Sequence, residues 1–252
     1  MPEDVRSRFA PVAANYTTAK FHSSEERLQE VLELACPQPG DVALDVATGT
    51  GHVALALAPH VRRVYGLDLT REMLEQAQGL TRKRSVDNAE WVLGDVAHLP
   101  FKDRSFDLYT VRAAPHHFHD LDAFLHEALR VLRPGRHAVF VDCSPPEPAR
   151  ELLHDVEMRR DPSHVRSLTV GEWVSRLEAV GFEVGSATIR ELDWDFDDWM
   201  HNMAVPGPVV RELAGVVESA KGEARKQLHP ERRDGHLWHA YWHCLIRAHR
   251  PG

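Results

Sequence analysis

The sequence is poor in cysteine and in positive charge, and it has no long hydrophobic run. Its three cysteines, Cys36, Cys143 and Cys244, are too scattered for a disulfide framework or a zinc-ligand pattern. No apolar stretch approaches the roughly 18 residues that span a bilayer, and the first residues are charged. We therefore expect a protein of the reducing cytoplasm, with no membrane partner.

Acidic residues outnumber basic ones by 38 to 30, which gives a formal net charge of −8. A dedicated nucleic-acid binder needs a surplus of lysine and arginine to neutralise phosphates, so we expect no nucleic-acid partner. The 252 residues, 43% of them hydrophobic, are enough for one large domain with a substantial core. The composition leaves a monomer and a homodimer both open.

Apolar stretches and amphipathic stretches alternate along the first 145 residues. The apolar stretches predict strands over 42–46, 61–67, 91–93, 106–111 and 138–141. The amphipathic stretches predict helices over 24–36, up to 58, around 73–77 and over 121–132. Strands that alternate with helices at this spacing form a parallel sheet with helices on both faces. The predicted fold class is therefore a doubly wound α/β sheet.

Two Ser/Thr-x-x-Glu patterns predict where helices begin. Ser23 with Glu26 is expected to cap the first helix, and Thr169 with Glu172 is expected to cap a helix that runs through Ala179. Further strands are expected over 182–192 and 237–249. The chain after residue 145 is thus predicted to add helices and strands of its own.

A glycine turn joins the first predicted strand to the helix that follows, in the segment LDVATGTG at 44–51. Gly49 and Gly51 let the backbone turn sharply and let a ligand lie against it without a Cβ in the way. Together with Ala54 they also satisfy the G-x-G-x-x-A form of the dinucleotide fingerprint. The turn predicts a nucleotide-containing cofactor and leaves NAD open.

Two acidic residues follow at the ends of later strands. Asp68 ends the second predicted strand, where a carboxylate accepts both hydroxyls of a ribose. Asp95 follows Gly94 after the third strand, a position that suits an adenine amino group. Because ligands of open α/β sheets bind at the carboxyl ends of the strands, both acids are expected to face the cofactor.

Five segments in this order resemble the class I S-adenosylmethionine-dependent methyltransferases. They are LDVATGTG at 44–51, GLDL at 66–69, GDV at 94–96, LPFKDRSFDL at 99–108 and RVLRPG at 130–135. AAPHHF at 113–118 and RDPSHVR at 160–166 further resemble a subgroup of the type 11 methyltransferase domain that is related to the quinone-biosynthesis methyltransferases. The resemblance implies a Rossmann-like sheet, mostly parallel with an antiparallel last strand, with an N-terminal helix and C-terminal cap elements.

The resemblance also implies, position by position, which residues bind S-adenosylmethionine. Those around the methionine part would be Asp45, Ala47, Thr48, Gly49 and Gly51, with the Arg112 carbonyl meeting the ammonium. Those around the adenosine would be Asp68 on the ribose, Leu69 and Met73 against the adenine face, and Asp95 and the Val96 amide at its edge.

Three regions of the chain follow from the same resemblance. Residues 1–23 would close over the site, with Tyr16 and His22 near the pocket, and residues 24–145 would form the core that binds S-adenosylmethionine. Residues 146–252 would supply helices that shape the substrate pocket and the final strands of the same sheet.

The implied reaction is the transfer of the cofactor's methyl group to a small-molecule acceptor by in-line displacement, an activity of class EC 2.1.1.-. The sulfonium already activates the methyl group, so the protein's main task is to align the two reactants. A general base is needed only for an acceptor that must lose a proton. His116 and His117, after the fourth strand, are the candidate bases; alternatively they only shape the turn.

Two other functions stay open at this point: an NAD-dependent oxidoreductase that uses the same glycine turn, and a non-catalytic protein that binds S-adenosylmethionine. We expect no metal, since no group of acidic residues and histidines has the spacing of a dedicated site. His116, His117 and His119 come nearest to such a group.

Overall fold

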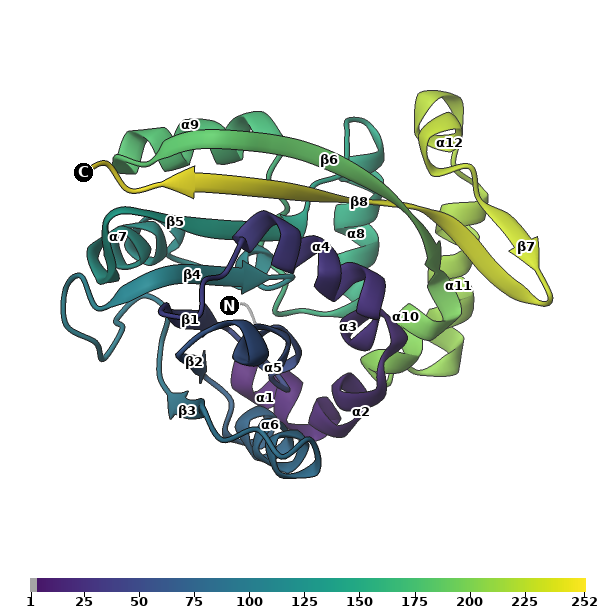
Figure 1. Cartoon of the computed structure of the whole chain (residues 1–252). Helices are drawn as coiled ribbons and strands as arrows, with labels where there is room; N and C mark the ends of the chain where they lie inside the picture. The colour runs from purple at the N-terminus through teal and green to yellow at the C-terminus, as the bar shows by residue number, and fades with distance from the viewer. Residues whose placement is uncertain (1–3) are drawn as a thin grey trace.

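The computed structural model describes residues 4–252, which fold around an eight-stranded mixed sheet (Figure 1). Its strands are β1 Val42–Val46, β2 Arg63–Asp68, β3 Ala89–Leu93, β4 Phe106–Arg112, β5 Leu132–Cys143, β6 Glu183–Asp195, β7 Glu231–Arg233 and β8 His236–His249. The order is β3-β2-β1-β4-β5-β8-β6, with β7 paired to β8. β1 to β5 run parallel, and β8 runs antiparallel between β5 and β6. The predicted sheet, mostly parallel with an antiparallel last strand, is confirmed.

Helices cover both faces of this sheet. One face carries α4 Glu25–Ala35, α5 His52–Leu57 and α6 Arg71–Lys83, and the other carries α7 Leu121–Val131 and α9 Val170–Val180. Side chains of α4 and α5 pack with alternate residues of β4 and β5, including Leu108, Val139 and Val141. Phe124 of α7 and Trp173 of α9 pack on the opposite face against Phe140. Burial on both sides explains why these strands read as continuous apolar runs.

A second core lies where β6 and β8 extend beyond the other strands (Figure 1). The helices around it are α8 Ala149–Arg160, α10 Phe196–Asn202, α11 Gly207–Glu218 and α12 Gly222–Leu228. Trp194 of β6 and Tyr241 of β8 stack in this core with ring centroids 4.6 Å apart. The C-terminal part of the chain thus supplies both strands of the main sheet and a helical layer of its own. Within residues 4–252, no helix combines the length and the apolar character that crossing a membrane requires.

The N-terminal segment forms three short helices, α1 Val5–Phe9, α2 Ala13–Thr18 and α3 Lys20–Ser23, with a 3₁₀ turn between the first two. Residues 1–3 of the predicted segment 1–23 lie outside the described residues. Thr17 on α2 reaches α6, where its hydroxyl lies 3.3 Å from Gln76 Oε1. The ring of Phe9 packs edge-on against His117, 5.2 Å between centroids. These contacts hold the segment against the carboxyl ends of the strands.

The two predicted helix caps have different outcomes. Thr169 and Glu172 form the expected capping box, with backbone-to-side-chain bonds of 3.2 and 2.8 Å. The cap predicted at Ser23 is wrong by one residue, because Ser24 caps α4 and accepts from the Arg27 amide. Ser23 ends α3 instead, where its hydroxyl donates to the Ala19 carbonyl at 3.0 Å. The short helix α3 occupies the position at which a cap was expected.

Candidate active site

The carboxyl ends of β1, β2 and β4 open into a cavity of about 390 Å³, here called the larger cavity. Its wall contains all but one of the residues predicted to bind the cofactor: Asp45, Ala47, Thr48, Gly49, Asp68, Leu69, Met73, Asp95, Val96 and Arg112. The exception is Gly51, which does not reach this wall. The parallel register of the strands therefore brings together residues that are far apart in the sequence.

The two glycines of the turn have different physical roles. Gly49 has φ of +54°, and a Cβ there would meet nothing within 4 Å, so the backbone lies bare against open space. Gly51 has φ of +82°, and a Cβ there would come within 2.4 Å of the Trp91 ring. Gly51 thus allows the turn to pack on Trp91, whereas Gly49 leaves room for a ligand. Ala47 also has a positive φ, of 46°.

Asp68 is buried at the end of β2 and is held by two backbone amides. One carboxylate oxygen accepts from Gly49 N at 2.8 Å, and the other accepts from Thr70 N at 2.9 Å. Burial raises the pKa of this carboxyl, while the two amide bonds oppose that shift. An ionised carboxylate has about four acceptor positions, so two remain for hydroxyl groups of a ligand.

Asp45 at the end of β1 is buried among hydroxyl donors. Thr48 Oγ1 donates to one carboxylate oxygen at 2.5 Å, and Thr110 Oγ1 donates to the other at 2.7 Å. Burial raises the pKa of Asp45 to about 6, although both hydrogen bonds and the charge of Arg112 oppose the shift. At neutral pH this end of the larger cavity therefore carries a negative charge that suits a ligand ammonium.

At the opposite end, the larger cavity is bounded by Leu69, Met73, Asp95 and Val96. Met73 is buried, whereas Asp95 is exposed and accepts a hydrogen bond from the Ala97 amide at 2.9 Å. An apolar surface with one exposed carboxylate at its edge suits a flat heteroaromatic group that carries an amino donor.

Residues of the N-terminal segment complete the wall of the larger cavity: Val5, Phe9, Tyr16 and His22. Tyr16 and His22 were expected near the pocket by resemblance, and their rings lie 4.8 Å apart. Phe9 and the buried His52 also line the cavity, and neither was predicted. Phe9 shows no local signal of this role, because its contact with His117 is purely tertiary.

A smaller cavity of about 60 Å³, here called the inner chamber, adjoins the larger one. The two share five wall residues, which are Phe9, Tyr16, His22, Ala113 and His117. The remaining aromatic walls of the inner chamber are Phe21, Trp194, Trp199 and Tyr241. Its polar side chains include His116, Cys143, Glu157, Arg160 and His243. The N-terminal segment and the C-terminal region thus enclose this chamber together.

His117 lies at the junction of the two cavities and is neutral. Burial, followed by the nearby charge of His116, lowers the pKa of His117 to about 3. Its Nδ1 lies 3.2 Å from the Ser163 hydroxyl, which itself donates to Asp161 at 2.7 Å. Because that hydroxyl has only one proton, Nδ1 of His117 must be the donor, and Nε2 keeps the free lone pair. Nε2 lies 4.0 Å from the Asp161 carboxylate.

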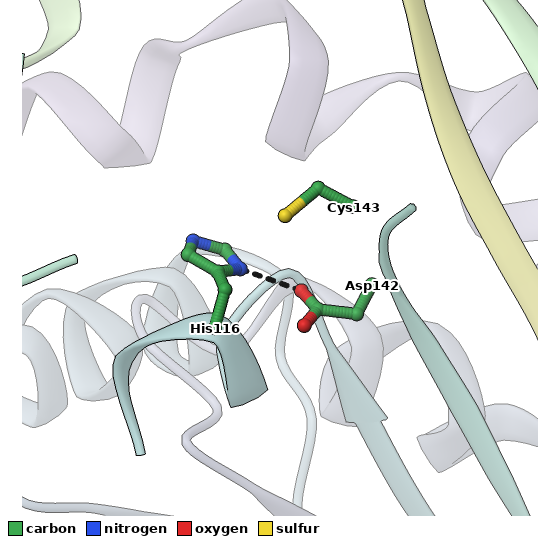
Figure 2. Close-up of side chains that lie close together, drawn as sticks. All are labelled: His116, Asp142 and Cys143. Atoms are coloured by element: carbon green, nitrogen blue, oxygen red, sulfur yellow. Dashed lines mark hydrogen bonds and ion pairs between the residues drawn. The ribbon is translucent and has the colours of Figure 1, made fainter. Parts of the chain in front are cut away.

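His116 faces away from the larger cavity and forms a buried cluster with Asp142 and Cys143 (Figure 2). Its Nδ1 lies 2.6 Å from Asp142 Oδ1. Burial alone would lower the pKa of His116, but the Asp142 carboxylate raises it. His116 is therefore paired with Asp142 and does not line the larger cavity, and its role as a base stays a prediction.

The same cluster combines nitrogen, oxygen and sulfur atoms that all lie within 4.8 Å of one another. His119, which was expected nearest to a metal-binding group, belongs to no such group among residues 4–252. Each cluster atom has a protein partner already: His116 pairs with Asp142, and Cys143 Sγ lies 2.9 Å from Ser167 Oγ. The cluster is therefore satisfied as an ion pair with a neighbouring thiol.

Comparisons with known proteins show to which family the chain belongs. The family model described as a methyltransferase domain matches residues 44–140, from β1 to β5. The uncharacterized methyltransferase YcgJ of Bacillus subtilis is 31% identical over 219 residues, which cover 86% of this chain and 87% of that protein. The chain belongs to the class I S-adenosylmethionine-dependent methyltransferases.

Two further comparisons place this methyltransferase more closely. The crystal structure of Bacillus subtilis YcgJ superimposes with a TM-score of 0.84 at 28% identity, covering 90% of this chain and 99% of that one. The demethylmenaquinone methyltransferase of Thermotoga maritima is 38% identical over 125 residues, 48% of this chain and 52% of that enzyme. The methyl donor of this methyltransferase is S-adenosylmethionine, and the NAD-dependent alternative is set aside.

Proposed function

We propose that this methyltransferase transfers the methyl group of S-adenosylmethionine from the larger cavity to a small-molecule acceptor in the inner chamber, by in-line displacement. The observation that carries the proposal is the shared wall of the two cavities. A donor in one and an acceptor in the other meet beside Ala113 and His117, where both cavities have access to the same surface. Alignment across such a junction supplies much of the rate enhancement of a displacement.

The larger cavity fits the donor in size and in chemistry. Its volume of about 390 Å³ lies within the range of pockets for cofactors. In this placement Asp68 accepts the ribose hydroxyls, and Leu69 and Met73 pack on the adenine. The bare backbone at Gly49 and the carboxylate of Asp45 adjoin the methionine part. Bound there, S-adenosylmethionine supplies an activated methyl group.

The chemistry of the inner chamber favours a neutral, flat acceptor. Its charged groups are paired within the protein, since Glu157 accepts from Tyr241 at 2.7 Å and from Arg160 at 3.3 Å. His116 is likewise paired with Asp142. No side-chain charge is thereby left to demand a counterion, and the aromatic walls offer faces and edges against which a ring can pack. An acceptor with a phenol-type or enol-type oxygen, or a ring carbon beside one, meets these conditions.

The inner chamber must widen before an acceptor enters. At about 60 Å³ it is smaller than the void of about 150 Å³ that holds a benzene molecule in a protein core. Phe9 and Tyr16 form part of its wall and belong to the N-terminal helices. We therefore assign to residues 4–23 the role of a cover that moves with the acceptor.

His117 is our candidate base for an acceptor that must lose a proton. Its Nε2 has a free lone pair, and it touches both cavities. The Asp161 carboxylate, 4.0 Å from Nε2, stabilises the imidazolium that forms when the proton is taken up. His22 is the second candidate, because it also lines both cavities.

The test is to incubate the protein with S-adenosylmethionine labelled in its methyl group and an extract of small molecules, and to search for labelled products by mass spectrometry. We expect label in a neutral aromatic or quinol-type product, and much less of it with the His117→Ala variant. Binding of S-adenosylhomocysteine without any labelled product would support a non-catalytic protein instead. Label only in strongly charged products would contradict the proposed acceptor class.

A further inference from the structure

The side chain of Arg112, at the end of β4, takes no part in the proposed function so far, which uses only its backbone. It projects from the same face of β4 as Thr110, two residues earlier, and so lies on the side of Asp45. One terminal nitrogen, Nη2, donates to the His22 carbonyl at 2.7 Å. The other, Nη1, is buried and has no hydrogen-bond partner among the described residues.

This guanidinium is a charged group with unused donors. Burial lowers the pKa of Arg112 to about 10, so the side chain stays protonated at neutral pH. Among residues 4–252, neither terminal nitrogen of Arg112 has a carboxylate partner, because Nη2 donates to the His22 carbonyl and Nη1 has no partner. The oxygens of Asp45 accept from two threonine hydroxyls instead. A guanidinium has five N–H donors, and leaving buried ones unpaired is costly. The unpaired donors of the Arg112 guanidinium therefore favour an anionic ligand.

His52 adds a second unsatisfied group at the same end of the larger cavity. Both of its ring nitrogens are buried and make no hydrogen bond of standard geometry among the described residues, although the nearby backbone of Tyr16 and Thr17 acts to raise the pKa of the ring. Burial, followed by the charge of Arg112, lowers the pKa of His52 to about 4, so the ring is neutral and can donate one hydrogen bond. Arg112 and His52 both line the larger cavity and not the inner chamber. Their ligand is therefore a part of the methyl donor rather than the acceptor.

We propose that the Arg112 guanidinium binds the α-carboxylate of the cofactor's methionine part, with the His52 imidazole as a second, neutral donor. An amino-acid end carries one ammonium and one carboxylate. This end of the cavity offers one carboxylate, Asp45, and one guanidinium, Arg112, whose charges interact. The ammonium of the cofactor thus pairs with the Asp45 carboxylate, and the carboxylate of the cofactor pairs with the Arg112 guanidinium. The inference rests on the proposed placement of the cofactor and gives the Arg112 side chain a role beyond that of its carbonyl.

The experiment compares two ligands that differ only in the carboxylate: S-adenosylhomocysteine and its decarboxylated analogue, S-adenosyl-3-thiopropylamine. Their dissociation constants are measured by calorimetry for the unmodified protein and for Arg112→Gln and Arg112→Lys. We expect the unmodified protein to prefer S-adenosylhomocysteine by about 10- to 100-fold, as for hydrogen bonds to a charged group. Arg112→Gln should lose that preference, while its affinity for the decarboxylated analogue stays within about twofold. Arg112→Lys should lose part of it.

Arg27→Gln is the matched control. Arg27 is also a partly buried arginine that stacks on Phe21, 4.9 Å from the ring centroid, but it lines a separate outer groove. Its replacement should leave both dissociation constants unchanged. An equal loss of both ligands in Arg112→Gln and Arg112→Lys, or no preference in the unmodified protein, would overturn the inference. Failure of the unmodified protein to bind S-adenosylhomocysteine at all would instead overturn the placement of the cofactor.

Discussion

The affinity of this methyltransferase for its cofactor should depend on pH through Asp45. In the ligand-free protein the pKa of this carboxyl is raised to about 6 by burial. Only the ionised carboxylate attracts the ammonium of the cofactor, so affinity is lost as pH falls through that value. At pH 5, about one unit below the pKa, roughly one molecule in eleven is ionised, and the apparent dissociation constant rises about tenfold. Near pH 7.5 the loss should be negligible.

The assay is calorimetric titration with S-adenosylhomocysteine between pH 5 and pH 7.5, in buffers of different ionisation enthalpy. Binding near pH 5.5 should release a proton, because the bound ammonium lowers the pKa of Asp45. Asp45→Asn should bind more weakly at pH 7.5 and show a flatter pH dependence. Burial also raises the pKa of Asp68, so the difference between the two proteins, rather than either curve alone, reports on Asp45.

Thr110→Val provides a directional check of the same reasoning. Thr110 Oγ1 donates to Asp45 at 2.7 Å, and this bond favours the ionised carboxylate. Without it the pKa of Asp45 should rise further, which moves the midpoint of the affinity curve toward higher pH, by up to about one unit. A midpoint that stays in place or moves down, or a curve that is identical in Asp45→Asn, would refute this explanation.

Three further predictions concern the turn, the ribose site and the two histidines. Gly51→Ala should lower the free energy of unfolding by about 2–5 kcal/mol in denaturant titrations, because it combines a positive φ with a clash on the Trp91 ring. Gly79→Ala in α6 is the control: a Cβ there meets nothing within 4 Å, so this substitution should stabilise the protein by up to about 1 kcal/mol. Asp68→Ala should weaken S-adenosylhomocysteine binding by about 1.5–3 kcal/mol in calorimetry, and an unchanged affinity in a folded variant would remove Asp68 from the site. Once an acceptor is known, His117→Ala should lower turnover about 100-fold with little change in cofactor affinity. His116→Ala should instead lower thermal stability, because it leaves Asp142 buried without its partner. Equal and negligible effects of His116→Ala and His117→Ala on turnover would show that the reaction needs only alignment of the reactants and no base.

The features that sequence analysis predicted correctly depend on short stretches of chain. The glycine turn, the acids at the strand ends and the Thr169 cap each occupy a few consecutive residues with their own chemical pattern. Strand bounds were less accurate: β5 runs from Leu132 to Cys143, whereas only 138–141 was expected. Its first residue pairs with Phe106 of β4 across an irregular register, and such a partner cannot be recognised from the strand's own sequence.

The features that were missed depend on contacts between distant parts of the chain. The Arg112 side chain is positioned by a hydrogen bond to the carbonyl of His22, which lies 90 residues earlier. Nothing in the segment around Arg112 indicates that partner. The separate roles of His116 and His117 likewise arise from Asp142 and Ser163, on elements that follow much later. Adjacent histidines look equivalent in a sequence, and only their partners distinguish a protonated one from a neutral one.

The position of β8 inside the sheet implies an order in which the two halves of the reaction centre mature during synthesis. All residues that line the larger cavity precede Leu121, whereas Tyr241 and His243 of the inner chamber belong to β8. Since β6 joins the path of the sheet only through β8, neither strand can join before β8 has left the ribosome. Chains leave the ribosome N-terminus first as they are made. In each newly made molecule the residues that line the larger cavity therefore leave the ribosome before the residues of β8 that complete the inner chamber.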